Sequence, residues 1–277
     1  MDTLIQALIL GLIQGLTEFL PISSSGHLIV VPQLLGWTDP FIDSLAFSVM
    51  LHLGTLVALL VYFRWDWIRL VPAGLAAVRD RSFAGDPDRR LAWLILATTF
   101  PAVIAGLLLN DPIETVFREA RLVAVMLVIG AAILWLADRW GSRRLGIGEI
   151  SFPIAIGIGV AQALALVPGI SRSGISISAG LLAGLRREPA ARFSFLMATP
   201  ITAMAGAYET LKLLRGESGV EIQLAPLAVG MVAACVSGMI AIAALLRFLR
   251  SNPTTVFAAY RIVLAAVVVT WWLAVGR

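Results

Sequence analysis

The stretch that decides the fold is QGLTEFLPISSSGH, residues 14–27, an apolar segment broken by a proline and three serines. A second stretch, AQALALVPGISRSG at residues 161–174, aligns with it without a gap at an offset of 148 residues. The identical pairs within 16 residues are Gly11 and Gly159, Gln14 and Gln162, Leu16 and Leu164, Ile22 and Ile170, Ser23 and Ser171, Ser25 and Ser173, and Gly26 and Gly174. Because polar residues are among the pairs, an internal repeat explains them better than shared hydrophobicity.

The composition places most of the chain in a membrane. Of its 277 residues, 59% are apolar and 14% are charged, whereas a soluble domain carries about 25% charged residues. A soluble enzyme and a disordered chain are excluded, and Cys235, the single cysteine, excludes a disulfide scaffold. The net charge of +4 comes from basic residues spread through short loops, which is typical of membrane topology and predicts no nucleic-acid partner.

Six segments approach the roughly 20 apolar residues that a helix needs to cross a bilayer. These predicted spans are 45–63, 92–109, 121–137, 194–211, 224–246 and 256–275. Two further apolar stretches, 3–35 and 151–185, are cut near the middle by Pro, Gly and serines, and we interpret them as broken, re-entrant hairpins. The predicted fold class is an all-α integral membrane protein.

The predicted elements divide a single membrane domain, 1–277, into two similar halves. Repeat one covers about 1–138 and repeat two about 151–277, each with one re-entrant hairpin followed by three spans. An odd number of crossings turns the second copy upside down relative to the first, which is an inverted-topology repeat. Irregular backbone survives at membrane depth only where protein or a wet cavity surrounds it, so we expect the two breaks to meet at mid-membrane.

The distribution of arginine sets the expected orientation. If the first hairpin enters from outside, the cytoplasmic stretches are about 64–91, 138–150, 186–192 and 247–252, and they hold 14 of the 21 basic residues. The outer stretches hold Arg118, Arg121, Lys212, Arg215 and Arg277. The positive-inside rule favours this assignment.

Almost all polar side chains within the apolar segments gather around the two breaks. They are Gln14, Glu18, His27, Gln162 and Arg172. A charged group at membrane depth costs at least about 2.5–3.5 kcal/mol, which favours a functional interpretation of Glu18 and Arg172. The structural alternative is that these two only neutralise each other as a buried pair. His27 is open to both interpretations, and we interpret His52, alone on a separate span, as structural.

The chemistry of these groups predicts a phosphate site. A helix that restarts after a Ser/Gly loop points free N–H groups and its positive dipole end at that loop, and a guanidinium adds a fork of donors. The expected phosphate-binding residues are Ser23, Ser25, Gly26, Ser171, Arg172, Ser173 and Gly174; the alternative for any one serine is that it caps a broken helix. Glu18 and Gln14, four apart on one helical face, are the candidate ligands of a divalent cation, although the recurrence of Gln14 at Gln162 also fits a scaffold role.

The two stretches resemble the signature motifs of the bacterial undecaprenyl-diphosphate phosphatases of the bacitracin-resistance type. The first motif matches from Gln14 through Glu18 to His27, and the second matches at Pro168, Gly169, Ser171, Arg172, Ser173 and Gly174. The resemblance extends over the whole chain in length and layout. The family has Glu or Gln at the position of Gln14, so this chain carries the less acidic alternative.

The resemblance implies hydrolysis of undecaprenyl diphosphate to the monophosphate, which recycles the lipid carrier for cell-wall synthesis and confers bacitracin resistance. It implies a Mg²⁺ or Ca²⁺ cofactor and Ser24 as the nucleophile, with His27 as the alternative. The chemistry of the residues themselves predicts that Arg172 neutralises charge in phosphoryl transfer, and that Glu18 either holds the metal or takes the proton from Ser24. It also implies a multi-pass protein of the bacterial inner membrane whose site opens to the outer, periplasmic side.

The residues themselves leave two other functions open. A transporter or lipid flippase uses the same design of inverted repeats with broken helices, and a membrane scaffold would leave Glu18 and Arg172 without a role. The expected partners are the bilayer and a polyprenyl diphosphate, whose tail can lie in lipid while its head enters the polar site. The sequence leaves the oligomeric state open, a homodimer included.

Overall fold

The computed structural model describes residues 2–108, 119–217 and 221–275, and within these ranges the secondary structure is helical, without a strand. The helices are α1 (Thr3–Phe19), α2 (Ser24–Leu35), α3 (Leu45–Tyr62), α4 (Arg64–Arg79), α5 (Pro87–Leu108), α7 (Ala120–Trp140), α8 (Phe152–Ala163), α9 (Arg172–Leu182), α10 (Arg187–Leu214), α11 (Leu224–Leu249) and α12 (Thr255–Val275). Short 3₁₀ turns cover Ile147–Glu149 and Leu164–Leu166. The all-helical prediction is confirmed.

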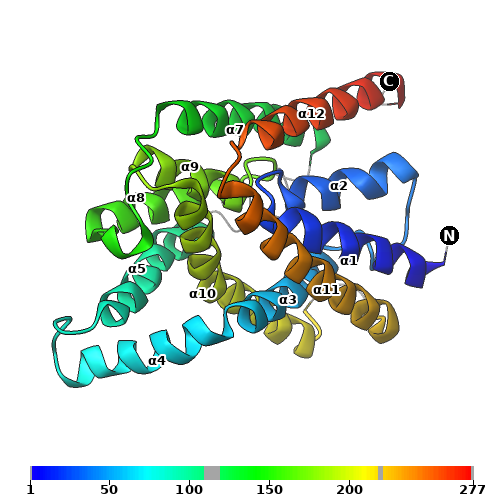
Figure 1. The fold of residues 1–277 in the computed structure, drawn as a ribbon. Helices are drawn as coiled ribbons and strands as arrows, with labels where there is room; N and C mark the ends of the chain where they lie inside the picture. The colour runs from blue at the N-terminus through cyan, green and yellow to red at the C-terminus, as the bar shows by residue number, and fades with distance from the viewer. Residues whose placement is uncertain (1, 109–118, 218–220, 276–277) are drawn as a thin grey trace.

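Both predicted hairpins are present. The first is α1, a break and α2; the second is α8, the 3₁₀ turn Leu164–Leu166, a break and α9. Each hairpin begins and ends on one side of the bundle, because Thr3 Oγ1 donates to Asp39 Oδ2 at 2.9 Å and Leu145 pairs with Leu185. The two hairpins point toward each other from opposite ends of the molecule (Figure 1).

Five helices are long and apolar enough to cross a membrane: α3, α5, α7, α11 and α12. They correspond to five of the six predicted spans, except that residue 109 of the span 92–109 lies outside the described residues. The sixth prediction, 194–211, lies within α10, which has 28 residues and is about 42 Å long at 1.5 Å per residue. It is less apolar than the others because it carries Thr199, Thr202 and Glu209.

One helix was not predicted. The polar stretch 64–91, expected as a cytoplasmic connection, contains α4 and the start of α5. Exposed apolar residues of α4, Trp65, Ile68, Leu75 and Val78, recur at near-helical spacing, so the amphipathic pattern was present in the sequence. The high charge of this stretch and Pro72 within it are untypical of a helix, so the pattern did not lead to the prediction of one.

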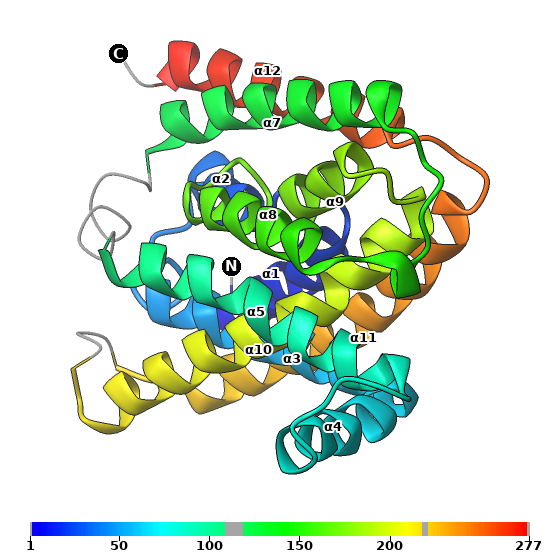
Figure 2. The same ribbon diagram turned by 90° about the vertical axis from the view of Figure 1, so that its left-hand side faces the viewer.

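The hairpins lie between two layers of longer helices. The α7–α12 pair covers one side and α3, α10 and α11 the other (Figure 2). The most extensive helix contact among the described residues is between α1 and α11, where a Cβ on Gly15 would lie 2.7 Å from the backbone nitrogen of Gly238. Small residues let membrane helices approach to this distance. In the matching arrangement of the second half, α8 packs on α5, with Gly159 against Thr98.

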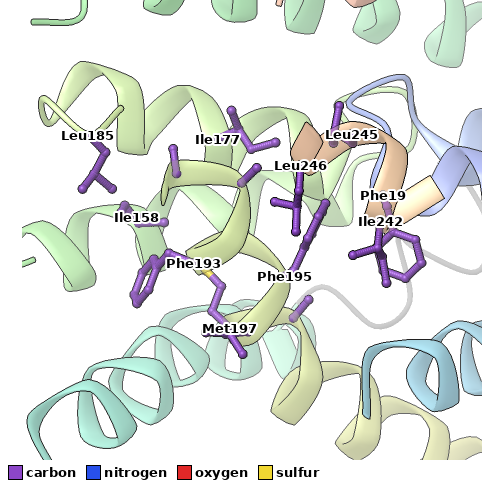
Figure 3. Packing of buried hydrophobic residues seen from close by; sticks show 14 of the residues in the cluster. Phe19, Ile158, Ile177, Leu185, Phe193, Phe195, Met197, Ile242, Leu245 and Leu246 are labelled. Atoms are coloured by element: carbon purple, nitrogen blue, oxygen red, sulfur yellow. The ribbon is translucent and has the colours of Figure 1, made fainter. Parts of the chain in front are cut away.

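A buried apolar cluster supports the end of α1 that carries the polar residues. Phe19 meets Phe195 of α10 edge to face, with ring centroids 5.3 Å apart at 81°. Ile242 and Leu246 of α11 belong to the same cluster (Figure 3). Since Phe19 follows Glu18 directly, this packing fixes where the Glu18 carboxylate lies.

Candidate functional site

The two breaks have the same local structure. Ser23 and Ser171 have φ of 71° and 72°, a region that side chains other than Gly rarely adopt. Each is the N-cap of the following helix, with its hydroxyl accepting from the backbone N–H of Gly26 at 3.3 Å or of Gly174 at 3.1 Å. These four residues, predicted to bind phosphate, therefore shape the two loops.

The two loops touch, as predicted. The Gly169 N–H donates to Ser23 Oγ at 3.2 Å, and the Ser173 hydroxyl donates to the Leu20 carbonyl at 3.1 Å. Ser23, Ser171 and Ser173 are buried. The loops of the two halves are therefore bonded to each other at the centre of the bundle.

Glu18 is the centre of the polar cluster. Its side chain is buried, and its Oε2 accepts from the Ser24 hydroxyl at 2.5 Å and from Gln14 Nε2 at 3.1 Å. Its Oε1 forms an ion pair with Arg172 Nη2. The Glu18 carboxylate of the first hairpin therefore binds both the hydroxyl of Ser24, the first residue of α2, and the guanidinium of Arg172, the first residue of α9.

Arg172 is held by three residues on two helices, α1 and α10. Besides Glu18, its Nη1 donates to Thr202 Oγ1 at 2.7 Å and to the Ala198 carbonyl at 3.2 Å, both on α10. The structural alternative for Glu18 and Arg172, a buried pair, therefore exists in the structure. Both side chains of the pair also line a cavity.

The cavity has a volume of about 250 Å³ and lies beside the Glu18 carboxylate. Its polar lining consists of Glu18, Ser24, Ser25, His52, Gln162, Ser171, Arg172 and Thr202. A second cavity of about 360 Å³ shares Ser25 and His52 with it and continues toward Tyr208 and Glu209 on α10. Both cavities are lined largely by apolar surface, with polar side chains at particular points.

The structure places the two histidines differently from the sequence prediction, because His52 lines the cavity and His27 does not. His52, interpreted as structural, lines the cavity with Nε2 3.4 Å from Glu18 Oε2, while its Nδ1 bonds the Ser48 carbonyl at 2.7 Å. His27, expected beside the phosphate, has Nδ1 2.7 Å from the Ser23 carbonyl and Nε2 2.8 Å from the Tyr260 hydroxyl. His27 does not line the cavity.

The residues around Glu18 fit a divalent cation that binds together with phosphate. The described residues contain no group of three His, Cys, Asp or Glu side chains arranged around a metal position. Two buried amide oxygens, Gln14 Oε1 and Gln162 Oε1, have no hydrogen-bond partner among the described residues. Gln14 contacts the Glu18 carboxylate through its nitrogen, and Gln162 lines the cavity. Mg²⁺ commonly takes one or two protein oxygens and completes its shell with phosphate and water, which this donor set can supply.

The chain is similar to known proteins over nearly its whole length. The model of the family described as bacitracin resistance protein BacA matches residues 7–267. A protein named undecaprenyl-diphosphatase from Gemmatimonas aurantiaca is 46% identical over 96% of this chain and 97% of its own length. Proteins of the same name from Moorella thermoacetica and Myxococcus xanthus are 44% and 45% identical, covering 98% and 95% of this chain and 99% and 86% of their own lengths.

Proposed function

This chain belongs to the bacitracin resistance protein BacA family, and we propose that the cavity beside Glu18 is where it hydrolyses undecaprenyl diphosphate. The products are undecaprenyl phosphate and inorganic phosphate. The reaction recycles the lipid carrier for cell-wall synthesis, and it fits the resistance to bacitracin after which the family is named. One observation carries the assignment of the site: the Ser24 hydroxyl donates to a buried carboxylate that is also paired with Arg172.

Ser24 is the nucleophile in this proposal. Its Oγ attacks the terminal phosphorus and passes its proton to Glu18 Oε2, which accepts from it at 2.5 Å. The bond from that phosphorus to the bridging oxygen breaks, and undecaprenyl phosphate leaves. Water then attacks the phosphoserine, inorganic phosphate leaves and Ser24 regains a proton. His27 lacks a free ring nitrogen for the same attack.

Charge neutralisation is the second requirement of phosphoryl transfer. Arg172 lies on the cavity wall with its guanidinium oriented by Thr202 and Ala198. The N-terminal ends of α2 and α9, at Ser24 and Arg172, add their dipoles. Ser25 and Ser171 supply hydroxyls on the same wall. The remaining predicted phosphate-binding residues contribute indirectly, because they set the shape of the two loops; these are Ser23, Gly26, Ser173 and Gly174.

A divalent cation, Mg²⁺ or Ca²⁺, completes the proposal. When bound, it neutralises the oxygens of the diphosphate. Glu18 supplies a carboxylate and Gln14 an amide oxygen, which has no other partner. Because Gln14 presents its nitrogen to Glu18, binding of the cation by both residues requires the amide to turn over.

The second cavity supports binding of the lipid tail. It adjoins the cavity beside Glu18 at Ser25 and His52, and Leu28, Ile29 and Leu45 supply apolar surface there. The protein is a multi-pass membrane protein, and we place it in the bacterial inner membrane with the site open to the periplasmic side. The two repeats, about 1–138 and 151–277, would then be inverted copies; the similar loops at Ser23 and Ser171 support this.

The deciding experiment is phosphate release from detergent-solubilised protein. A hydrolase releases inorganic phosphate from a polyprenyl diphosphate without any gradient, whereas a transporter or flippase requires two compartments. We expect multiple turnovers by the wild-type protein and none by Glu18→Gln. Absence of phosphate release from folded wild-type protein supplied with Mg²⁺ would contradict the proposal.

A further inference from the structure

Arg261 of α12 is a fully buried cation that the proposed reaction does not use. Its relative exposure is 0%. Its hydrogen bonds within the described residues all go to backbone carbonyls: Nη2 to Gly169 at 2.7 Å, Ile170 at 2.8 Å and Met126 at 3.4 Å, and Nε to Leu127 at 3.2 Å. A buried charge is expensive to retain and marks function by default, so its position on the second loop requires an explanation.

Glycines on two other helices leave space for the Arg261 side chain. A Cβ on Gly130 of α7 would lie 2.6 Å from the guanidinium carbon, and a Cβ on Gly174 of α9 would lie 2.9 Å from Nη1. The absence of side chains at these two positions therefore leaves room for the guanidinium. Nη1 is buried and has no partner among the described residues. The donors that do bind are directed at two carbonyls of the second loop, those of Gly169 and Ile170, and two of α7, those of Met126 and Leu127.

The preceding residue, Tyr260, holds the first loop. Its hydroxyl lies 2.8 Å from His27 Nε2, and the two rings stack with centroids 5.7 Å apart. His27 Nδ1 is 2.7 Å from the Ser23 carbonyl. Because a carbonyl can only accept, Nδ1 carries the hydrogen, and Nε2 of the neutral ring accepts from Tyr260. His27 thus transmits the position of Tyr260 to the Ser23 backbone.

The contacts made by Arg261 and those made by Tyr260 each end next to a serine with positive φ, Ser171 or Ser23. Arg261 binds the Ile170 carbonyl, which shares a peptide bond with Ser171, and the Tyr260–His27 chain ends on the carbonyl of Ser23. Strained backbone persists only where its surroundings over-determine it. The residues that follow Ser23 and Ser171 in the chain are Ser24 and Arg172.

We propose that Tyr260 and Arg261 are positioning residues that hold the two loops in register, so that Ser24 and Arg172 meet the same phosphate. This inference rests on the proposed function. Two adjacent residues of one helix hold one loop each, so a small shift of either changes the separation of the two reacting groups. The hydrogen bonds and ion pairs described for Glu18, Ser24 and Arg172 go to residues outside α12.

The experiment compares Tyr260→Phe, Arg261→Lys and Arg261→Met with wild type in steady-state phosphate release from a polyprenyl diphosphate in detergent. Loss of one hydrogen bond in Tyr260→Phe is expected to lower kcat about fivefold. Arg261→Lys, which cannot reach two carbonyls and Leu127 with one ammonium, is expected to lower kcat at least about tenfold, and Arg261→Met further. KM stays within about twofold, because the cavity walls are intact.

Matched controls separate positioning from general damage. Tyr62→Phe at the end of α3 and Arg247→Lys, exposed on α11, are expected to leave kcat unchanged. All rates are normalised to folded protein by thermal melting. If Arg261→Met does not fold, Tyr260→Phe, which removes a single oxygen, decides the question.

Three outcomes are informative. A fall in kcat at constant KM for Tyr260→Phe and Arg261→Lys supports the inference. A kcat within about twofold of wild type for Tyr260→Phe, or a rise in KM that accounts for the whole loss, overturns it. An inactive wild-type protein contradicts the proposed function instead, so the two failures are distinguishable.

Discussion

Ser24 and Arg172 are bound to the two oxygens of one carboxylate. The Ser24 hydroxyl donates to Glu18 Oε2 at 2.5 Å, and the Arg172 guanidinium pairs with Oε1. The repeat relates these positions, because Ser24 and Arg172 are 148 residues apart. A hydroxyl in one copy and a guanidinium in the other give the two halves different chemical tasks at a shared centre.

Arg172→Lys should inactivate the protein almost as fully as Arg172→Ala. The guanidinium bonds Glu18 on one nitrogen and Thr202 on the other, whereas an ammonium supplies the same charge without a planar fork. Loss of one charge-assisted hydrogen bond, about 1.5–3 kcal/mol, corresponds to at least about a tenfold loss in rate. The measurement is phosphate release by folded protein. A loss of about threefold or less would mean that Arg172 acts by charge alone.

Removal of divalent cations should abolish turnover, and Mg²⁺ or Ca²⁺ should restore it. The proposed cation site offers one carboxylate, that of Glu18, and the amide oxygen of Gln14, which has no hydrogen-bond partner among the described residues. Affinity for the cation therefore depends on the substrate's phosphates. Gln14→Glu adds a second carboxylate and should lower the Mg²⁺ concentration that gives half-maximal rate. Full activity in excess chelator, with unchanged melting temperature, would exclude the cation.

Gly15→Ala should destabilise the fold. The new Cβ would lie 2.7 Å from the Gly238 nitrogen and against Ser237, and this backbone cannot move aside cheaply. Overpacking of this kind costs about 1–3 kcal/mol. The matched control is Gly157→Ala in α8, where nothing lies within 4 Å of the added carbon. Equal melting temperatures for the two variants in detergent would contradict the close packing of α1 on α11.

Topology can be read from single cysteines in a Cys235→Ala background. Ser82→Cys lies between α4 and α5, and Glu217→Cys follows α10; Asp111, an outer position by sequence, lies outside the described residues. The arginine bias predicts that an impermeant thiol reagent labels Glu217→Cys but not Ser82→Cys in intact cells. The reverse pattern would invert the orientation.

The hairpins and their contact were predictable because their causes are local. Each break has a proline together with a Ser/Gly cluster within an apolar stretch, and irregular backbone of this kind needs surrounding protein or a wet cavity at membrane depth. Costly polar residues at both breaks indicate that the breaks face each other. The repeat also placed Ser24 near Arg172. These predictions needed only the order of residues around Glu18 and Ser171.

The contributions of His52, Thr202 and Tyr260 were not predictable in the same way. Each is a polar residue on a largely apolar helix, and its role depends on which face that helix turns toward the hairpins. His27 shows the same limit in reverse: its neighbours in sequence suggest the phosphate site, but Tyr260, 233 residues away, binds its ring. Contacts between distant helices depend on packing, which periodicity does not specify.

The most direct measurement of the central claim is to trap the phosphorylated protein. Wild type and the Ser24→Ala and His27→Ala variants are mixed with a polyprenyl diphosphate labelled in its terminal phosphate, quenched in acid and digested. Phosphoserine survives acid and phosphohistidine does not. We predict acid-stable label on the Ser24 peptide in wild type, none in Ser24→Ala together with complete loss of turnover, and a trace of turnover in His27→Ala. Near-normal turnover by Ser24→Ala would exclude Ser24 as the nucleophile.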